Sequence, residues 1–124
     1  MAKTILVVDD SSTMLMSLKN TLEVSGFSVL TASDGAVALV KLQGGAKPDL
    51  IITDINMPNM GGIEFIGKAR GLAGFKFIPI LALTTESQQS KREEAKKLGA
   101  TGWLLKPVSG ADLNKIIKQV LPGA

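Results

Sequence analysis

Three aspartates that follow apolar segments form the most informative group of residues in this 124-residue chain. Asp9 and Asp10 come directly after the apolar segment 5–8. Asp54 closes the apolar segment 50–53. If these segments are adjacent parallel strands, the three carboxylates meet in one crevice. Like charges at that spacing repel one another, and a hard divalent cation such as Mg²⁺ on oxygen ligands offsets the repulsion. The simpler alternative is that each aspartate caps a helix or forms a turn separately.

Two further polar residues stand at equivalent places. Thr84 follows the apolar segment 80–83, and Lys106 follows 103–105. The Lys106 ammonium is a point charge that can neutralise phosphoryl oxygens, and the Thr84 hydroxyl can donate a hydrogen bond to one of them. Together with the aspartates, these residue types indicate phosphoryl chemistry at a metal site.

Within such a site the aspartates have different expected roles. Asp10 and Asp54 can bind Mg²⁺ directly, and Asp9 can do so directly or through water. Asp54 is the most central, so one of its oxygens could attack phosphorus and form an aspartyl phosphate. No residue of the group is a strong general base, so we expect slow hydrolysis of that bond.

The elements that must position these residues form a repeating pattern, because apolar and amphipathic segments alternate five times. We predict strands at 4–8, 27–31, 50–53, 80–83 and 103–105, and helices at about 12–25, 34–43, 61–70, 87–98 and 109–121. This pattern predicts an α/β fold with a doubly wound, five-stranded parallel sheet and helices on both faces. Ligands of such folds bind at the carboxyl ends of the strands. Only the second strand brings no reactive group, so we place it at a sheet edge beside the first.

Composition excludes several classes of protein. The chain has no Cys and no His, which removes disulfides, thiolate nucleophiles and histidine bases or metal ligands. Its net charge of +3 is spread along the chain without a dense basic run, so nucleic-acid binding is not expected. Neither a signal peptide nor an apolar stretch of membrane-spanning length is present, which predicts a cytoplasmic protein without membrane insertion. We expect residues 1–124 to form a single domain, with no output domain.

The residues singled out above belong to four motifs. They are Val7-Val8-Asp9-Asp10-Ser11, Thr53-Asp54-Ile55-Asn56-Met57-Pro58-Asn59-Met60-Gly61-Gly62, Leu83-Thr84-Thr85 and Leu105-Lys106-Pro107. Over its whole length the chain resembles the receiver domain of two-component response regulators, most closely the stand-alone chemotaxis regulators of the CheY type. The resemblance implies a flavodoxin-like, CheY-like sheet with the strand order 2-1-3-4-5.

The resemblance also implies roles for individual residues. Asp54 would be the phosphoacceptor, taking its phosphoryl group from a histidine kinase. The Mg²⁺ ligands would be Asp9, Asp10, Asp54 and the backbone carbonyl of Asn56. Such a protein is a signalling switch that promotes its own phosphorylation and slow dephosphorylation, and is not an enzyme in the usual sense.

Switching is implied as a movement of Thr84 toward the phosphoryl group and an inward turn of the aromatic residue on the fifth strand. That aromatic is commonly Tyr or Phe, whereas here it is Trp103, which needs a larger cavity and has no phenol hydroxyl. The Lys106-Pro107 bond resembles the cis peptide of the family. Packing alone is the alternative role for Trp103.

The implied partners are a CheA-like histidine kinase and a flagellar motor switch protein, with the chain itself a monomer. The basic residues of segment 87–98 favour an acidic partner, or else form a solvated, ion-paired face. A shuttle or phosphate sink in a phosphorelay is the alternative within the family. A small Mg²⁺-dependent aspartyl-phosphate phosphatase is the alternative outside it, but the haloacid-dehalogenase type needs Asp where Ser11 stands.

Overall fold

A computed structural model describes residues 3–85, 89–106 and 108–121. The strands are β1 (Thr4–Val8), β2 (Ser28–Ala32), β3 (Leu50–Thr53), β4 (Ile80–Thr84) and β5 (Gly102–Leu105), and the helices are α1 (Ser12–Val24), α2 (Gly35–Gln43), α3 (Gly62–Arg70), α4 (Gln89–Leu98) and α5 (Gly110–Val120). Every predicted strand and helix is present, and its ends lie within two residues of the prediction.

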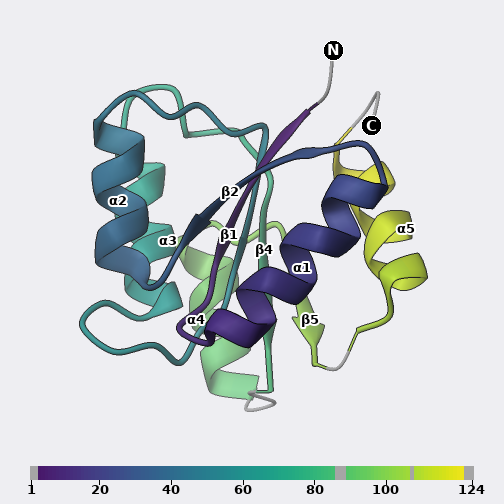
Figure 1. The fold of residues 1–124 in the computed structure, drawn as a ribbon. Helices are drawn as coiled ribbons and strands as arrows, with labels where there is room; N and C mark the ends of the chain where they lie inside the picture. Colours follow the sequence, from purple (N-terminus) through teal and green to yellow (C-terminus); the bar gives the residue numbers. More distant parts are fainter. Residues whose placement is uncertain (1–2, 86–88, 107, 122–124) are drawn as a thin grey trace.

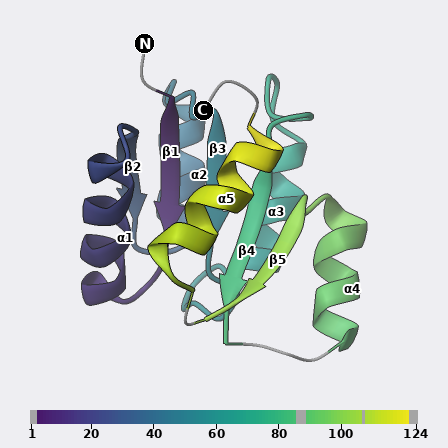
Figure 2. The same ribbon diagram turned by 90° about the vertical axis from the view of Figure 1, so that its right-hand side faces the viewer.

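The five strands form one parallel sheet in the order β2-β1-β3-β4-β5, as Figure 2 shows. The predicted strand order is therefore confirmed, and β2 lies at the edge beside β1. Val8 pairs with Thr53, and Thr84 pairs with Leu105. This register brings the carboxyl ends of β1 and β3 to the same level, and those of β4 and β5 likewise.

Helices cover both faces of the sheet (Figure 1). Helices α1 and α5 pack on one face, where Leu22 and Ile117 meet Ile5. Helices α2, α3 and α4 pack on the other, where Phe65 meets Leu6. Successive residues of β1 thus point to opposite faces, and both faces are buried. This double burial explains why the strands are nearly continuous apolar segments in the sequence.

Polar caps and a glycine set the ends of the helices. The Ser11 hydroxyl accepts a hydrogen bond from the Met14 N–H and begins α1. After α1, Gly26 has a φ of 96°, a left-handed conformation that glycine adopts without steric cost. The Ser109 hydroxyl accepts a hydrogen bond from the Asp112 N–H and begins α5. Ser109 therefore caps α5.

Among the residues described, no helix combines the length and the apolar character needed to cross a membrane.

Candidate functional site

The three aspartates converge at the carboxyl edge of the sheet. One carboxylate oxygen from each of Asp9, Asp10 and Asp54 lies within 4.8 Å of the others. The side chains of Asp9 and Asp54 are buried, whereas Asp10 is exposed. Asp9 also forms a local turn, because its Oδ1 accepts a hydrogen bond from the Ser11 N–H at 3.0 Å. The predicted cluster is thus present, and one member makes the local turn as well.

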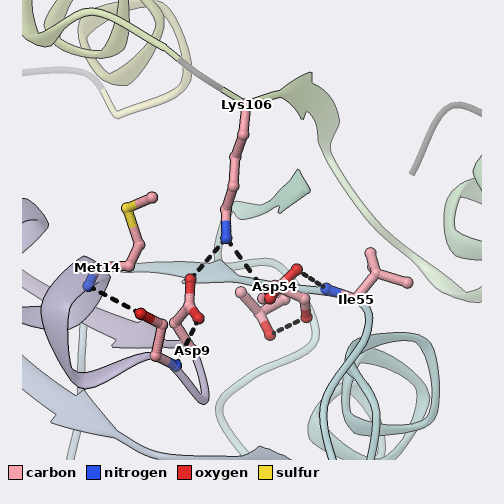
Figure 3. A network of polar contacts seen from close by, with 7 residues as sticks. Asp9, Met14, Asp54, Ile55 and Lys106 are labelled. Atoms are coloured by element: carbon pink, nitrogen blue, oxygen red, sulfur yellow. Dashed lines mark hydrogen bonds and ion pairs between the residues drawn. The ribbon is translucent and has the colours of Figure 1, made fainter. Parts of the chain in front are cut away.

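Lys106 reaches this cluster from the end of β5 (Figure 3). Its Nζ donates a hydrogen bond to Asp9 Oδ2 at 2.8 Å and lies 3.5 Å from Asp54 Oδ2. The ammonium therefore partly offsets the repulsion between two buried carboxylates. Its closer partner is Asp9 and not Asp54.

Asp54 is held by its own chain and by a close backbone contact. Its Oδ1 accepts a hydrogen bond from the Ile55 N–H at 2.7 Å, and its Oδ2 faces the Lys106 ammonium (Figure 3). The start of α3 passes so near that a Cβ on Gly62 would lie 2.0 Å from the Asp54 carbonyl oxygen. Glycine is therefore required at Gly62, since any larger residue would displace the backbone of the central aspartate.

Thr84 and Trp103 lie on the two strands beyond β3. Thr84 is fully buried at the end of β4, and its carbonyl oxygen accepts a hydrogen bond from the Lys106 N–H at 2.8 Å. Trp103 is half-buried on β5, beside a cavity of about 230 Å³ that it lines together with Arg92, Lys96 and Ala100. This cavity therefore lies between α4 and β5.

Asn56 lies in the exposed loop after Asp54. Its side-chain Oδ1 accepts a hydrogen bond from Lys91 Nζ of α4 at 3.5 Å. The Lys106–Pro107 bond, for which the resemblance implies a cis form, extends outside the described residues, and residues 87 and 88 of the predicted fourth helix also lie outside them.

The donor set suits a hard divalent cation. The three ligand candidates are carboxylates, which Mg²⁺ prefers, and the exposed Asp10 leaves the cluster accessible from solvent. An octahedral Mg²⁺ takes one or two carboxylates and keeps several waters, so this cluster supplies enough oxygens.

One polar pair at this edge was not predicted from the sequence. Asp34, two residues after β2, is buried, and its Oδ2 accepts a hydrogen bond from the Asn59 side-chain amide at 3.0 Å. A polar side chain thus follows the second strand at this edge, where the sequence predicted only that no reactive group would stand. The available signal was an Asp before a helix-forming segment, which predicts a helix cap.

Comparison with known proteins identifies one family. Residues 5–118 match the response regulator receiver domain. Chemotaxis protein CheY1 of Helicobacter pylori is 41% identical over 118 residues, which cover 94% of this chain and 95% of that protein. The alkaline phosphatase synthesis transcriptional regulatory protein PhoP of Bacillus subtilis is 39% identical over 98% of this chain, but only 49% of PhoP is covered. Among solved structures, Vibrio cholerae CheY4 superposes with a TM-score of 0.93 at 45% identity, covering 98% of this chain and all of that one.

Proposed function

The chain belongs to the response regulator receiver domain family, and from that premise we propose that it is a phosphorylation-dependent switch with Asp54 as its phosphoacceptor. The observation that carries the proposal is the convergence of three carboxylates and one ammonium at the carboxyl edge of the sheet. A histidine kinase is the proposed phosphodonor. The kinase, the metal and the downstream target are each open to direct test.

The chemistry follows from the two oxygens of the Asp54 carboxylate. Oδ1 is held by the Ile55 N–H, so the side chain cannot turn freely. Oδ2 then attacks phosphorus, the P–N bond of a phosphohistidine breaks, and the electron pair of that bond leaves with the imidazole. The Lys106 ammonium, already on the Oδ2 side, neutralises the incoming phosphoryl oxygens.

Asp9, Asp10, Asp54 and the backbone carbonyl of Asn56 are the proposed Mg²⁺ ligands. When bound, Mg²⁺ supplies positive charge for the phosphoryl oxygens and orients them. Because the chain has no His or Cys, no such side chain can act as a base for the attacking water. We therefore expect the aspartyl phosphate to hydrolyse slowly, which suits a signal and not a phosphatase.

The proposed readout lies on α4, β5 and α5. A phosphoryl group on Asp54 would attract the Thr84 hydroxyl, and this movement would leave space that Trp103 could fill by turning inward. The rim of that surface is basic, because Arg92, Lys96 and Lys97 are exposed on α4. An acidic partner segment is the class that this charge favours.

For the pathway, we propose a cytoplasmic chemotaxis messenger that carries the signal from a CheA-like kinase to a flagellar motor switch protein. Two of the relatives reported above are named chemotaxis proteins and are covered over nearly their whole length. PhoP, a transcriptional regulator, contains a similar segment. Because these relatives have different functions, the downstream target must be identified by binding experiments with this protein.

The test of the phosphoacceptor uses a small phosphodonor, Mg²⁺ and intact-mass measurement. Wild type should gain one phosphoryl group and Asp54→Asn none. Asp49→Asn is the matched control, because Asp49 precedes the same strand at its other end and should leave uptake unchanged. Equal uptake by Asp54→Asn would show that another residue is the acceptor.

The test of the readout uses the fluorescence of Trp103, the only tryptophan. Beryllofluoride should shift the emission of wild type, while Thr84→Ala should still accept phosphate but show little shift. An equal shift in both proteins would exclude Thr84 as the link. Capture of phosphotransfer proteins instead of motor components by the beryllofluoride form would favour the phosphorelay shuttle.

A further inference from the structure

We propose that Asp34 and Asn59 are positioning residues for the metal site, because together they hold the loop that carries Asn56. This inference rests on the proposed function in one respect, namely that the Asn56 carbonyl is a metal ligand. Neither residue belongs to the acidic cluster. Their effect would be transmitted through the backbone of the β3–α3 loop, residues 54–61.

The first observation is the bonding of the Asp34 carboxylate. Its Oδ1 accepts a hydrogen bond from the Val37 N–H at 2.9 Å and caps α2. Its Oδ2 accepts a hydrogen bond from Asn59 Nδ2 at 3.0 Å. One buried carboxylate therefore joins the start of α2 to a loop that is 25 residues away in sequence.

The second observation is the conformation of Asn59. Its φ is 65°, and it is the only non-glycine residue among those described with a positive φ. Asparagine tolerates this left-handed conformation better than most residues, but it is still uncommon outside glycine. The Asp34 hydrogen bond thus secures a backbone conformation that the loop would not hold reliably by itself.

A third contact lies beside the first two. The Gly35 N–H donates a hydrogen bond to the Met60 carbonyl oxygen at 3.1 Å. A Cβ on Gly35 would lie 2.8 Å from that same oxygen. The start of α2 and the β3–α3 loop are therefore in direct backbone contact. The two ends of the loop are joined by a hydrogen bond that the Gly62 N–H donates to the Ile55 carbonyl oxygen at 2.9 Å.

Asn56 lies between these two points of attachment. The Ile55–Gly62 bond fixes where the loop leaves β3, and the Asp34–Asn59 pair fixes its far side. A backbone carbonyl can serve as a ligand only if its peptide is held in the required orientation, because it has no rotamers of its own with which to adjust. Helix capping alone would use only one oxygen of Asp34 and would not require an amide at position 59.

The experiment measures Mg²⁺ affinity by calorimetry in variants that separate these roles. Asp34→Asn keeps a capping oxygen for Val37 but presents an N–H to Asn59, so the pair is lost while the cap remains. Asn59→Gly permits the positive φ without strain and removes the amide with the rest of the side chain. The double variant Asp34→Asn/Asn59→Asp reverses donor and acceptor and retains the net charge.

Each single variant should weaken Mg²⁺ binding by about tenfold, the lower end of the effect of outer-shell partners, and the double variant should recover most of the loss. The matched control is Asp49→Asn. Asp49 Oδ2 accepts a hydrogen bond from the Thr4 N–H at 2.8 Å, at the opposite edge of the sheet, so this variant makes the same chemical and charge change far from the loop. Its Mg²⁺ affinity should equal that of wild type.

A second measurement does not involve the metal. Hydrogen exchange of the Gly35 amide in metal-free protein should be faster in both single variants, since that amide bonds to the loop. Unchanged Mg²⁺ affinity in Asp34→Asn and Asn59→Gly would overturn the proposal, as would an equal loss in Asp49→Asn. Asp10→Ala separates the two hypotheses. If it weakens binding while the loop variants do not, only the positioning role is wrong; if it has no effect, the metal site itself is wrong.

Discussion

Replacement of Lys106 by methionine should change stability and Mg²⁺ affinity in opposite directions. The Lys106 ammonium lies 2.8 Å from Asp9 Oδ2 and 3.5 Å from Asp54 Oδ2. The exposed fractions of these three side chains are 14%, 3% and 11%, so the group is largely removed from solvent. Lys106→Met keeps an unbranched side chain, one atom shorter than that of lysine, but leaves two buried carboxylates without their cation.

The expected loss of stability follows from these distances. A unit charge pair at 2.8 Å interacts by roughly 6 kcal/mol at an effective dielectric constant of about 20. Removal of one partner from a buried pair commonly costs about 3–5 kcal/mol. Because Lys106 retains some exposure and Asp10 is open to solvent, we expect about 3 kcal/mol in EDTA, at the lower end of that range. For a domain of this size, this loss lowers the melting midpoint by roughly 10 °C.

Mg²⁺ should reverse the effect. In wild type the ammonium occupies Asp9 Oδ2, and a metal ion must compete with it for that oxygen. Without the ammonium the same carboxylates are free for the metal, so Lys106→Met should bind Mg²⁺ more tightly than wild type. Urea unfolding in EDTA and in saturating Mg²⁺ measures the first effect, and calorimetry measures the second.

Lys118→Met is the control, because Lys118 is an exposed residue of α5 and its removal changes the net charge equally. Equal stability of Lys106→Met and Lys118→Met in EDTA would show that the ammonium does not stabilise the buried carboxylates. Weaker Mg²⁺ binding by Lys106→Met than by wild type would show that the ammonium supports the metal and does not compete with it.

Three further variants test other parts of the structure. Arg70→Lys should lower the free energy of unfolding in urea by about 2 kcal/mol. The Arg70 guanidinium donates hydrogen bonds to several backbone carbonyls, including that of Gly99, and a lysine ammonium cannot form all of these bonds at once. The Asn59 amide, followed by the Val37 N–H, holds the pKa of Asp34 below its ordinary value of 3.8. The stability that Asp34 contributes is therefore complete above that value and is lost as pH falls through the lowered pKa. Below about pH 4, the free energy of unfolding measured in urea should therefore fall less steeply with pH in Asp34→Asn than in wild type. Asp10→Ala should raise stability in EDTA by relieving repulsion while weakening Mg²⁺ binding, and a loss of stability in EDTA would contradict this reading of the cluster.

The sheet and most of the site could be predicted because they depend on short-range patterns. The strands are buried on both faces, so each is a recognisable apolar segment between amphipathic ones. Once the strands are parallel, the residues after them must share one edge, and Asp9, Asp54 and Lys106 do. Position in the strand was therefore sufficient to predict that these residues meet.

The pairings within the site could not be predicted in the same way. That Lys106 lies closer to Asp9 than to Asp54 depends on differences of less than one ångström between side chains from three strands. The Asp34–Asn59 pair joins two loops, and loop residues follow no hydrophobic period that would indicate their neighbours. Asp34 alone indicates a helix cap, and the positive φ of Asn59 leaves no mark in the sequence beyond the residue type.

The position of Lys106 bears on how a phosphoryl group on Asp54 would be transmitted. An aspartyl phosphate carries more negative charge than the carboxylate it replaces, so it would attract the ammonium away from Asp9 Oδ2. The Lys106 N–H is bonded to the Thr84 carbonyl, which connects the ends of β4 and β5 at the residues proposed to respond. A shift of Lys106 would thus act on the same two strand ends as the hydroxyl of Thr84, and both effects would reach Trp103 through β5. Lys106→Met removes the effect of the ammonium, and Thr84→Ala removes the effect of the hydroxyl. Comparison of the Trp103 fluorescence shift in these two variants would therefore measure how much each effect contributes to the response.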